Sequence, residues 1–100
     1  MNKRIGPVHP GEVLLCEFLQ PHGISQTRLA KEIGVSARGV NEICLTRRGI
    51  SADMALRLSI FFGTSPEFWM TLQNDYDMRI AKMNAESSLR KIIHPFAKAS

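Results

Sequence analysis

The segment Gln26–Leu45 constrains the fold of this chain more than any other part of its sequence. Its residues, QTRLAKEIGVSARGVNEICL, predict two short helices joined by a tight turn. Gly34 falls in the turn, where a positive φ is cheap only for a residue without a Cβ. Ala30 is the small residue at the point where the two helices would cross. The core-facing positions of the pair would be Leu29, Ile33, Val40 and Ile43. The pattern is typical of a helix-turn-helix.

The outer face of the second of these helices carries short or polar side chains. They are Ser36, Ala37, Arg38, Asn41 and Glu42. Arginine can pair with guanine through two hydrogen bonds, asparagine can do the same with adenine, and glutamate can accept a hydrogen bond from cytosine. A second helix of this kind lies in the DNA major groove with its first residues against the bases. We therefore predict that these five residues read DNA bases.

Two flanking segments are predicted to contact DNA phosphates. Gln26 and Thr27 open the first helix, where free backbone N–H groups and short polar side chains can hold a phosphate. Thr46, Arg47 and Arg48 follow the second helix and would form a basic loop beside it.

Simpler interpretations of the same residues stay open. Arg38 and Glu42 are four residues apart and could form a surface ion pair worth about 0.3–0.5 kcal/mol. Arg47 and Arg48 could belong to a solvated loop.

Cap residues and apolar spacing predict an all-α, five-helix domain, because no stretch shows sustained period-two alternation. The helices are expected at about residues 9–20, 25–33, 36–45, 51–62 and 65–84. Four serines are expected to cap the last four helices: Ser25, Ser36, Ser51 and Ser65. We divide the chain into an N-terminal arm (1–8), the helix-turn-helix domain (9–84) and a short C-terminal tail (85–100), in which Pro95 prevents a continuous helix. Trp69 is assigned to the core.

Composition limits the function classes. The chain has 100 residues, 44% of them hydrophobic, and a net charge of +4, which fits one small domain and an anionic partner. Cys16 and Cys44 are too few for a disulfide framework or a zinc site and are expected to be small core residues. His9 and His22 are expected at the surface. No nucleophile, base and acid share a recognisable spacing, so we expect neither an enzyme nor a metal or cofactor.

The localisation is expected to be cytoplasmic. The N-terminal residues show no signal peptide, and no segment approaches the about 20 apolar residues of a membrane span.

A homodimer is predicted from apolar residues beyond the needs of a small core. They are Ile80, Met83, Leu89, Ile92 and Ile93, in the last helix and the tail. A two-fold dimer would place two reading helices in successive major grooves about 34 Å apart and would require a palindromic operator.

Several short motifs together resemble those of the HigA antitoxins, also called virulence-associated protein I-like, within the Xre/lambda-repressor-like class. The motifs are HPGE (9–12), GV (34–35), NEI (41–43), RGI (48–50), ADMALRL (52–58) and, above all, GTSPEFW (63–69) with LQ (72–73) and DYD (75–77). The resemblance covers roughly residues 9–81.

The resemblance implies a five-helix lambda-repressor-like fold and a DNA-binding homodimer. It also implies two activities: repression of its own operon through a palindromic operator, and neutralisation of a HigB-like toxin, a ribosome-dependent mRNA-cleaving RNase of the RelE type. The base-reading and phosphate-contacting positions named above match the family's DNA-binding surface. Two alternatives stay open: a stand-alone Xre-family repressor without a toxin, and a protein–protein adaptor, which would leave the polar face of the second helix without a purpose.

Overall fold

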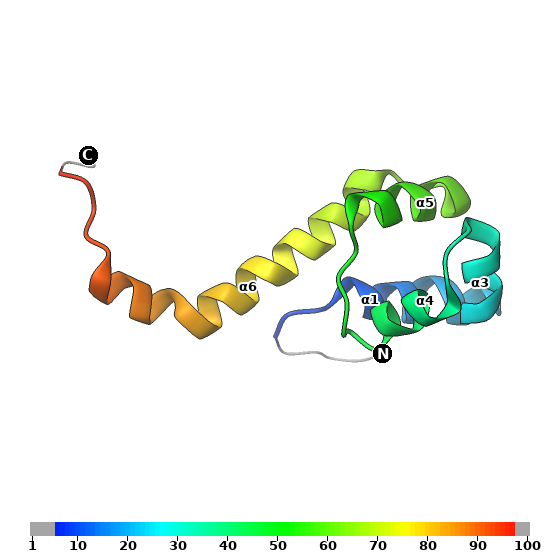
Figure 1. The fold of residues 1–100 in the computed structure, drawn as a ribbon, viewed down its shortest axis with the longest axis horizontal. Helices are drawn as coiled ribbons and strands as arrows, with labels where there is room; N and C mark the ends of the chain where they lie inside the picture. The colour runs from blue at the N-terminus through cyan, green and yellow to red at the C-terminus, as the bar shows by residue number, and fades with distance from the viewer. Residues whose placement is uncertain (1–5, 98–100) are drawn as a thin grey trace.

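The computed structural model describes residues 6–97, which form five helical units and no strand (Figure 1). In chain order the elements are α1 (Pro10–Val13), the π-helical η1 (Leu14–Leu19), α2 (Gln20–His22), α3 (Gln26–Ile33), α4 (Ala37–Cys44), α5 (Ala52–Phe62) and α6 (Pro66–Ile92). Because α1, η1 and α2 follow one another without a break, they make one helix, and the predicted five-helix, all-α fold is confirmed. Residues 1–5 of the predicted arm and 98–100 of the tail lie outside the described residues.

The starts of four helices follow directly from the sequence. The side chains of Ser25, Ser36, Ser51 and Ser65 each accept a hydrogen bond from the backbone N–H three residues later, at 3.0–3.1 Å. A cap of this kind stabilises a helix by about 1 kcal/mol relative to alanine. The four predicted caps are therefore confirmed.

The first helix continues past its predicted end at Gln20. It ends at His22, and Gly23 follows with a φ of 64°. Within η1 the hydrogen bonding widens, so that the N–H of Gln20 donates to the carbonyl of Leu15. This wider turn precedes Pro21, whose ring would clash with a carbonyl in a regular α-helix. The predicted end at Gln20 was two residues early, because the π-helical turn accommodates Pro21.

The core lies where the first helix, α3, α4, α5 and the start of α6 meet. Trp69 is fully buried, and its indole N–H donates to the Thr64 hydroxyl at 2.9 Å. The rings of Phe18 and Trp69 lie 4.9 Å apart between centroids. The remaining large core side chains include Leu14, Leu19, Leu29, Ile43 and Leu58. The assignment of Trp69 to packing is confirmed.

The two cysteines differ in their surroundings. Cys44 is buried as expected, and burial raises the pKa of its thiol to about 11, which keeps it protonated. Cys16 is exposed on the first helix. Its assignment to the core was wrong because it lies on the outer side of that helix, between core positions Leu14 and Leu19.

His9 is buried, contrary to the prediction of a surface position. It is 3% exposed, and its Nδ1 accepts a hydrogen bond from the N–H of Gly11 at 2.8 Å. The ring of Tyr76, from α6, meets it edge-on at 4.8 Å between centroids. Gly11 brings α1 against α4, since a Cβ there would collide with the carbonyl oxygen of Ile43. The packing of α1 between α4 and α6 therefore encloses His9.

The last helix is longer than its sequence pattern indicated. It continues to Ile92 instead of ending near residue 84. Its second half projects from the rest of the molecule (Figure 1), and the molecule as a whole measures 53 × 27 × 22 Å. Local interactions support the extension: Glu86 and Arg90 pair at 2.9 Å across one turn, and Pro95 follows only after the helix has ended. Within residues 6–97, no helix combines the length and the apolar character needed to cross a membrane.

Candidate nucleic-acid interface

The two helices predicted from Gln26–Leu45 are α3 and α4, and they pack against each other through buried side chains. Gly34 joins them with a φ of 73°, as expected. The buried residues of the pair include Leu29, Ala30, Ile33, Val40 and Ile43. The predicted core-facing positions are therefore confirmed, and the opposite face of α4 is left exposed.

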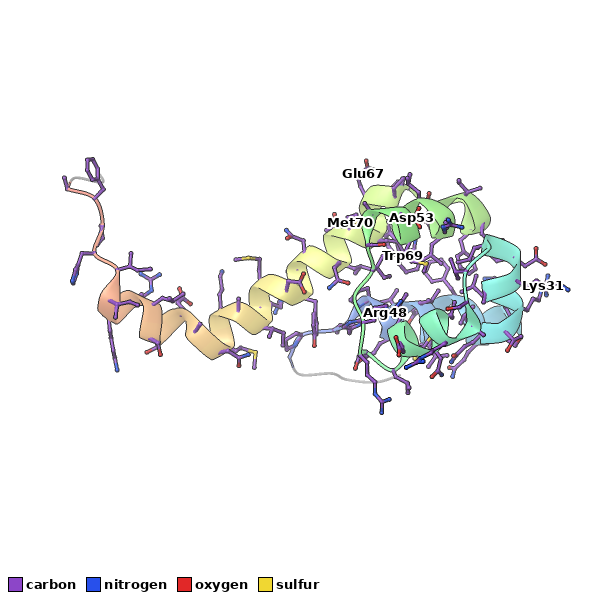
Figure 2. The ribbon with its side chains drawn as sticks, viewed as in Figure 1. Lys31, Arg48, Asp53, Glu67, Trp69 and Met70 are labelled. Atoms are coloured by element: carbon purple, nitrogen blue, oxygen red, sulfur yellow. The ribbon has the colours of Figure 1, made fainter. Side chains whose placement is uncertain are left out.

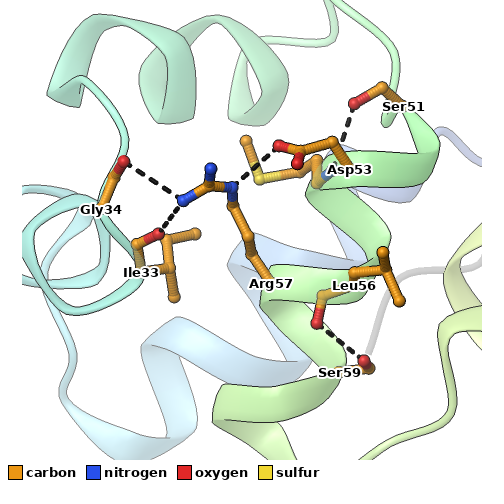
Figure 3. Close-up of polar contacts among 8 residues, drawn as sticks. Ile33, Gly34, Ser51, Asp53, Leu56, Arg57 and Ser59 are labelled. Atoms are coloured by element: carbon orange, nitrogen blue, oxygen red, sulfur yellow. Dashed lines mark hydrogen bonds and ion pairs between the residues drawn. The ribbon is translucent and has the colours of Figure 1, made fainter.

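Arg57 holds the turn between α3 and α4 (Figure 3). Its Nη1 donates to the carbonyl of Ile33 at 2.7 Å and to that of Gly34 at 3.3 Å, while its Nε contacts Asp53 at 2.8 Å. These carbonyls lie at the end of α3, where no further turn of the helix can satisfy them. Arg57, which comes from α5, therefore fixes the direction in which α4 leaves the turn.

The five predicted base-reading residues lie at the start and along one side of α4. Ser36, Ala37, Arg38 and Asn41 are exposed, and Glu42 is half-buried. The Ser36 hydroxyl is engaged as the helix cap through the N–H of Gly39.

Glu42 binds two arginines. The Nε of Arg38 lies 3.2 Å from its Oε2, and the Nη2 of Arg48 lies 2.7 Å from its Oε1. The side chain of Arg38 is 87% exposed, against 25% for Glu42. The surface ion pair between Arg38 and Glu42 is thus present, and the same carboxylate also holds Arg48, which the sequence did not indicate.

Arg48 lies close to α4 because the chain turns back at Thr46. Thr46 has a φ of 62°, an unusual value for a residue with a branched Cβ, and it turns the chain back after α4. A Cβ on Gly39 would lie 3.5 Å from the Nη1 of Arg48, so this guanidinium lies close to the first turn of α4. Figure 2 shows Arg48 beside α4. Arg48 therefore pairs with Glu42 on α4 while its side chain stays 56% exposed, so the interpretation of Arg47 and Arg48 as a solvated loop stays open. Arg47 beside it is exposed.

The predicted phosphate-contacting and base-reading groups touch each other at Gln26. The Nδ2 of Asn41 donates to the Oε1 of Gln26 at 3.0 Å. Thr27 is exposed next to Gln26. This contact joins the first turn of α3 to the outer face of α4.

Gln73, in α6, supports the loop after α4 and was missed from the sequence. Its Oε1 accepts a hydrogen bond from the N–H of Ile50 at 2.6 Å, and its Nε2 donates to Asp77 at 2.9 Å. A Cβ on Gly49 would lie about 2.9 Å from the Gln73 amide, which explains the glycine at that position. No local pattern could reveal this contact, because the two hydrogen-bonded residues are 23 positions apart.

Histidine, cysteine and carboxylate side chains make no cluster of three or more able to hold a metal ion within residues 6–97.

The residues predicted to form a dimer surface do not share one face. Met83 is 69% exposed, Leu89 45% and Ile92 71%. Ile80 and Met83 continue the stripe of Trp69, whereas Leu89 is six residues beyond Met83 and points about 240° further around the helix. Leu89 and Ile93 line an open hollow of about 400 Å³ together with Met78 and Lys82, and Ile80 and Met83 are not part of its lining.

Comparison with known proteins places this geometry among DNA-binding regulators. A helix-turn-helix family model matches residues 17–69. Virulence-associated protein I of Dichelobacter nodosus is 44% identical over 80 residues, which cover 80% of this chain and 74% of that protein. Antitoxin HigA-1 of Vibrio cholerae is 36% identical over 72% of this chain and 68% of its own length. A solved structure of Pseudomonas aeruginosa antitoxin HigA with the higBA promoter is 46% identical to this chain and superposes with a TM-score of 0.87. The match covers 90% of this chain and 98% of that chain.

Proposed function

This chain belongs to the HigA-type antitoxins of the helix-turn-helix family, and on that premise we propose that it is a sequence-specific DNA-binding repressor. The observation that carries the proposal is the exposed, polar face of α4, flanked by the basic loop at Arg47 and Arg48. The solved structure from Pseudomonas aeruginosa, whose fold this chain shares, is that of antitoxin HigA with the higBA promoter. An operator in the promoter of its own gene is the proposed ligand.

Individual residues take the roles expected from their chemistry. Arg38 and Asn41 would contact bases, with Ser36, Ala37 and Glu42 beside them. Gln26, Thr27, Thr46, Arg47 and Arg48 would contact phosphates at either end of α4. The Gln73–Ile50 hydrogen bond supports this assignment because it anchors the basic loop to α6.

A titration on DNA tests the proposal. The protein should retard a duplex from its own promoter at low salt and bind an unrelated duplex of equal length far more weakly. Specific binding typically exceeds non-specific binding by about 10³-fold or more. The absence of any shift at low salt would contradict the proposal.

We further propose that the protein neutralises a HigB-like toxin of the RelE type. The family name of its relatives supports this role. Co-expression with a small basic reading frame next to the gene should give a complex that survives purification, and the antitoxin should restore growth. If no such frame lies beside the gene, or the two products do not bind, the protein is a stand-alone repressor.

A homodimer is proposed as the form that binds DNA, with Leu89, Ile92 and Ile93 at its two-fold axis. The exposure of these residues in the single chain supports the proposal. Since one two-fold contact cannot use opposite sides of α6, we place Ile80 and Met83 outside this contact. Binding to an operator would place the protein in the cytoplasm, with no cofactor required.

A further inference from the structure

The carboxylate of Glu42 is shared between two arginines in the free protein. One oxygen lies 2.7 Å from the Nη2 of Arg48 and the other lies 3.2 Å from the Nε of Arg38. Both acceptor oxygens therefore have a cationic partner before any DNA is present. To accept a hydrogen bond from cytosine, Glu42 would have to share or give up one of these partners.

The contact orients Arg38 in a specific way. Glu42 engages the Nε of Arg38, which leaves the Nη1 and Nη2 edge of the guanidinium pointing away from the carboxylate. That edge can donate two parallel hydrogen bonds to the O6 and N7 of guanine. An arginine held by its Nε loses less rotational freedom when it meets the base, because part of its ordering is already present in the free protein.

Arg48 keeps Glu42 in place from the other side. Its Nη1 lies close to Gly39 in the first turn of α4, and Thr46, with a φ of 62°, turns the chain between Glu42 and Arg48. The side chain of Glu42 is only 25% exposed as a result. Neighbouring parts of the chain, the start of α4 and the loop after it, thus act on the orientation of one carboxylate.

The same carboxylate reduces the positive charge that α4 offers to phosphates. Binding to non-specific DNA depends on charge alone, because it comes from contacts with phosphates and the release of counterions. A negative charge between two arginines therefore opposes non-specific binding, while a correctly placed guanine still gains the two hydrogen bonds from Arg38.

From these contacts we propose that Glu42 is a positioning residue that makes Arg38 selective for guanine and weakens binding to non-specific DNA, instead of reading a base itself. The inference rests on the proposed function of operator binding. It replaces direct cytosine recognition, which the sequence alone suggested for Glu42.

A double-mutant cycle tests the proposal. Wild type, Arg38→Ala, Glu42→Ala and the double variant are titrated at one salt concentration by fluorescence anisotropy. The ligands are the promoter duplex, a set of duplexes with each operator base pair replaced in turn, and a non-specific duplex. Glu42→Ala should bind non-specific DNA several-fold more tightly and lower the ratio of specific to non-specific affinity about tenfold. Arg38→Ala and Glu42→Ala should relax preference at the same guanine, and the double variant should lose little beyond Arg38→Ala.

Two controls separate this role from a structural one. Asp75→Asn removes one acidic charge and one ion pair, with Arg79 at 3.0 Å, from the exposed surface of α6 and should leave the affinity ratio unchanged. Glu42→Gln keeps an oxygen acceptor for the Nε of Arg38 and should restore part of the guanine preference. The thermal midpoint of each variant is measured alongside.

The outcomes are distinct. Loss of preference at a different base pair in Glu42→Ala, additive with Arg38→Ala, would show that Glu42 reads a base directly and would overturn the proposal. A parallel loss of affinity for every duplex with a lowered thermal midpoint would also overturn it, in favour of a structural role. Failure of the wild-type protein to prefer the promoter duplex would instead overturn the proposed function itself.

Discussion

Arg38 and Asn41 are both exposed on α4 but are held differently. Arg38 is oriented by Glu42 on its own helix, whereas Asn41 is tied to Gln26 on α3. Replacement of either by alanine should cost about 1–3 kcal/mol in operator affinity and relax preference at one base pair. Titrations on duplexes with single base-pair changes measure both effects. Uniform weakening on all duplexes would contradict a base-reading role.

His9 gives the folded protein a dependence on pH. Burial lowers the pKa of its imidazole, while Glu12 and Asp77 partly offset this effect. Because the folded pKa lies below the unfolded value of about 6.5, protonation favours the unfolded chain. The contribution of His9 is therefore fully present above about pH 6.5 and is lost as the pH falls through the folded pKa.

Chemical denaturation at neutral pH and near pH 5 tests this prediction, because it measures the free energy of unfolding at each pH. The free energy of unfolding should fall on acidification, and part of the fall should disappear in His9→Asn, whose side chain can still accept the Gly11 N–H. An equal loss of stability in the wild type and in this variant would exclude His9 as its source.

At the scale of elements, the turn between α3 and α4 depends on a residue from α5. Arg57→Met keeps the apolar stem but removes the hydrogen bonds to the carbonyls of Ile33 and Gly34. We expect a loss of about 1–2 kcal/mol in the free energy of unfolding, measured in urea. Asp53→Asn should cost less than about 0.5 kcal/mol, because its ion pair with Arg57 is well exposed. A similar cost for both variants would contradict the importance assigned to the carbonyl contacts.

The loop after α4 is an element whose role depends on charge. Arg47 is exposed there and is proposed to contact a phosphate. Arg47→Ala should weaken binding to operator and unrelated DNA alike and lower the slope of log affinity against log salt by about one. Anisotropy titrations over a range of salt concentrations measure the slope. An unchanged slope would place Arg47 outside the contact.

At the scale of the whole molecule, the projecting half of α6 has no partner within the single chain. Leu89→Glu would place a carboxylate in the hollow beside Glu86, and we expect it to convert a dimer into a monomer at micromolar concentration. Sedimentation velocity measures the change, and circular dichroism checks that the helix persists. Met83→Glu, on another side of α6, is the matched control and should leave the dimer intact. Dissociation by Met83→Glu alone would reverse the assignment of faces.

Much of the fold could be predicted because its signals are local. Each serine cap contacts a residue three positions later, and Gly34 and Gly63 end their helices through their own φ. The helix-turn-helix was recognisable for the same reason. The extension of α6 also rests on local interactions, such as Glu86 with Arg90, so its early predicted end was an error of interpretation.

The sequence by itself therefore determined the number of helices, their starts and the face of α4 that meets solvent. Only the tertiary structure decided the burial of His9, the exposure of Cys16 and the support of the basic loop by Gln73. The physical reason is the range of the interactions. Helix caps and turn glycines act within a few residues of the chain, whereas burial and loop support arise only when distant segments pack together.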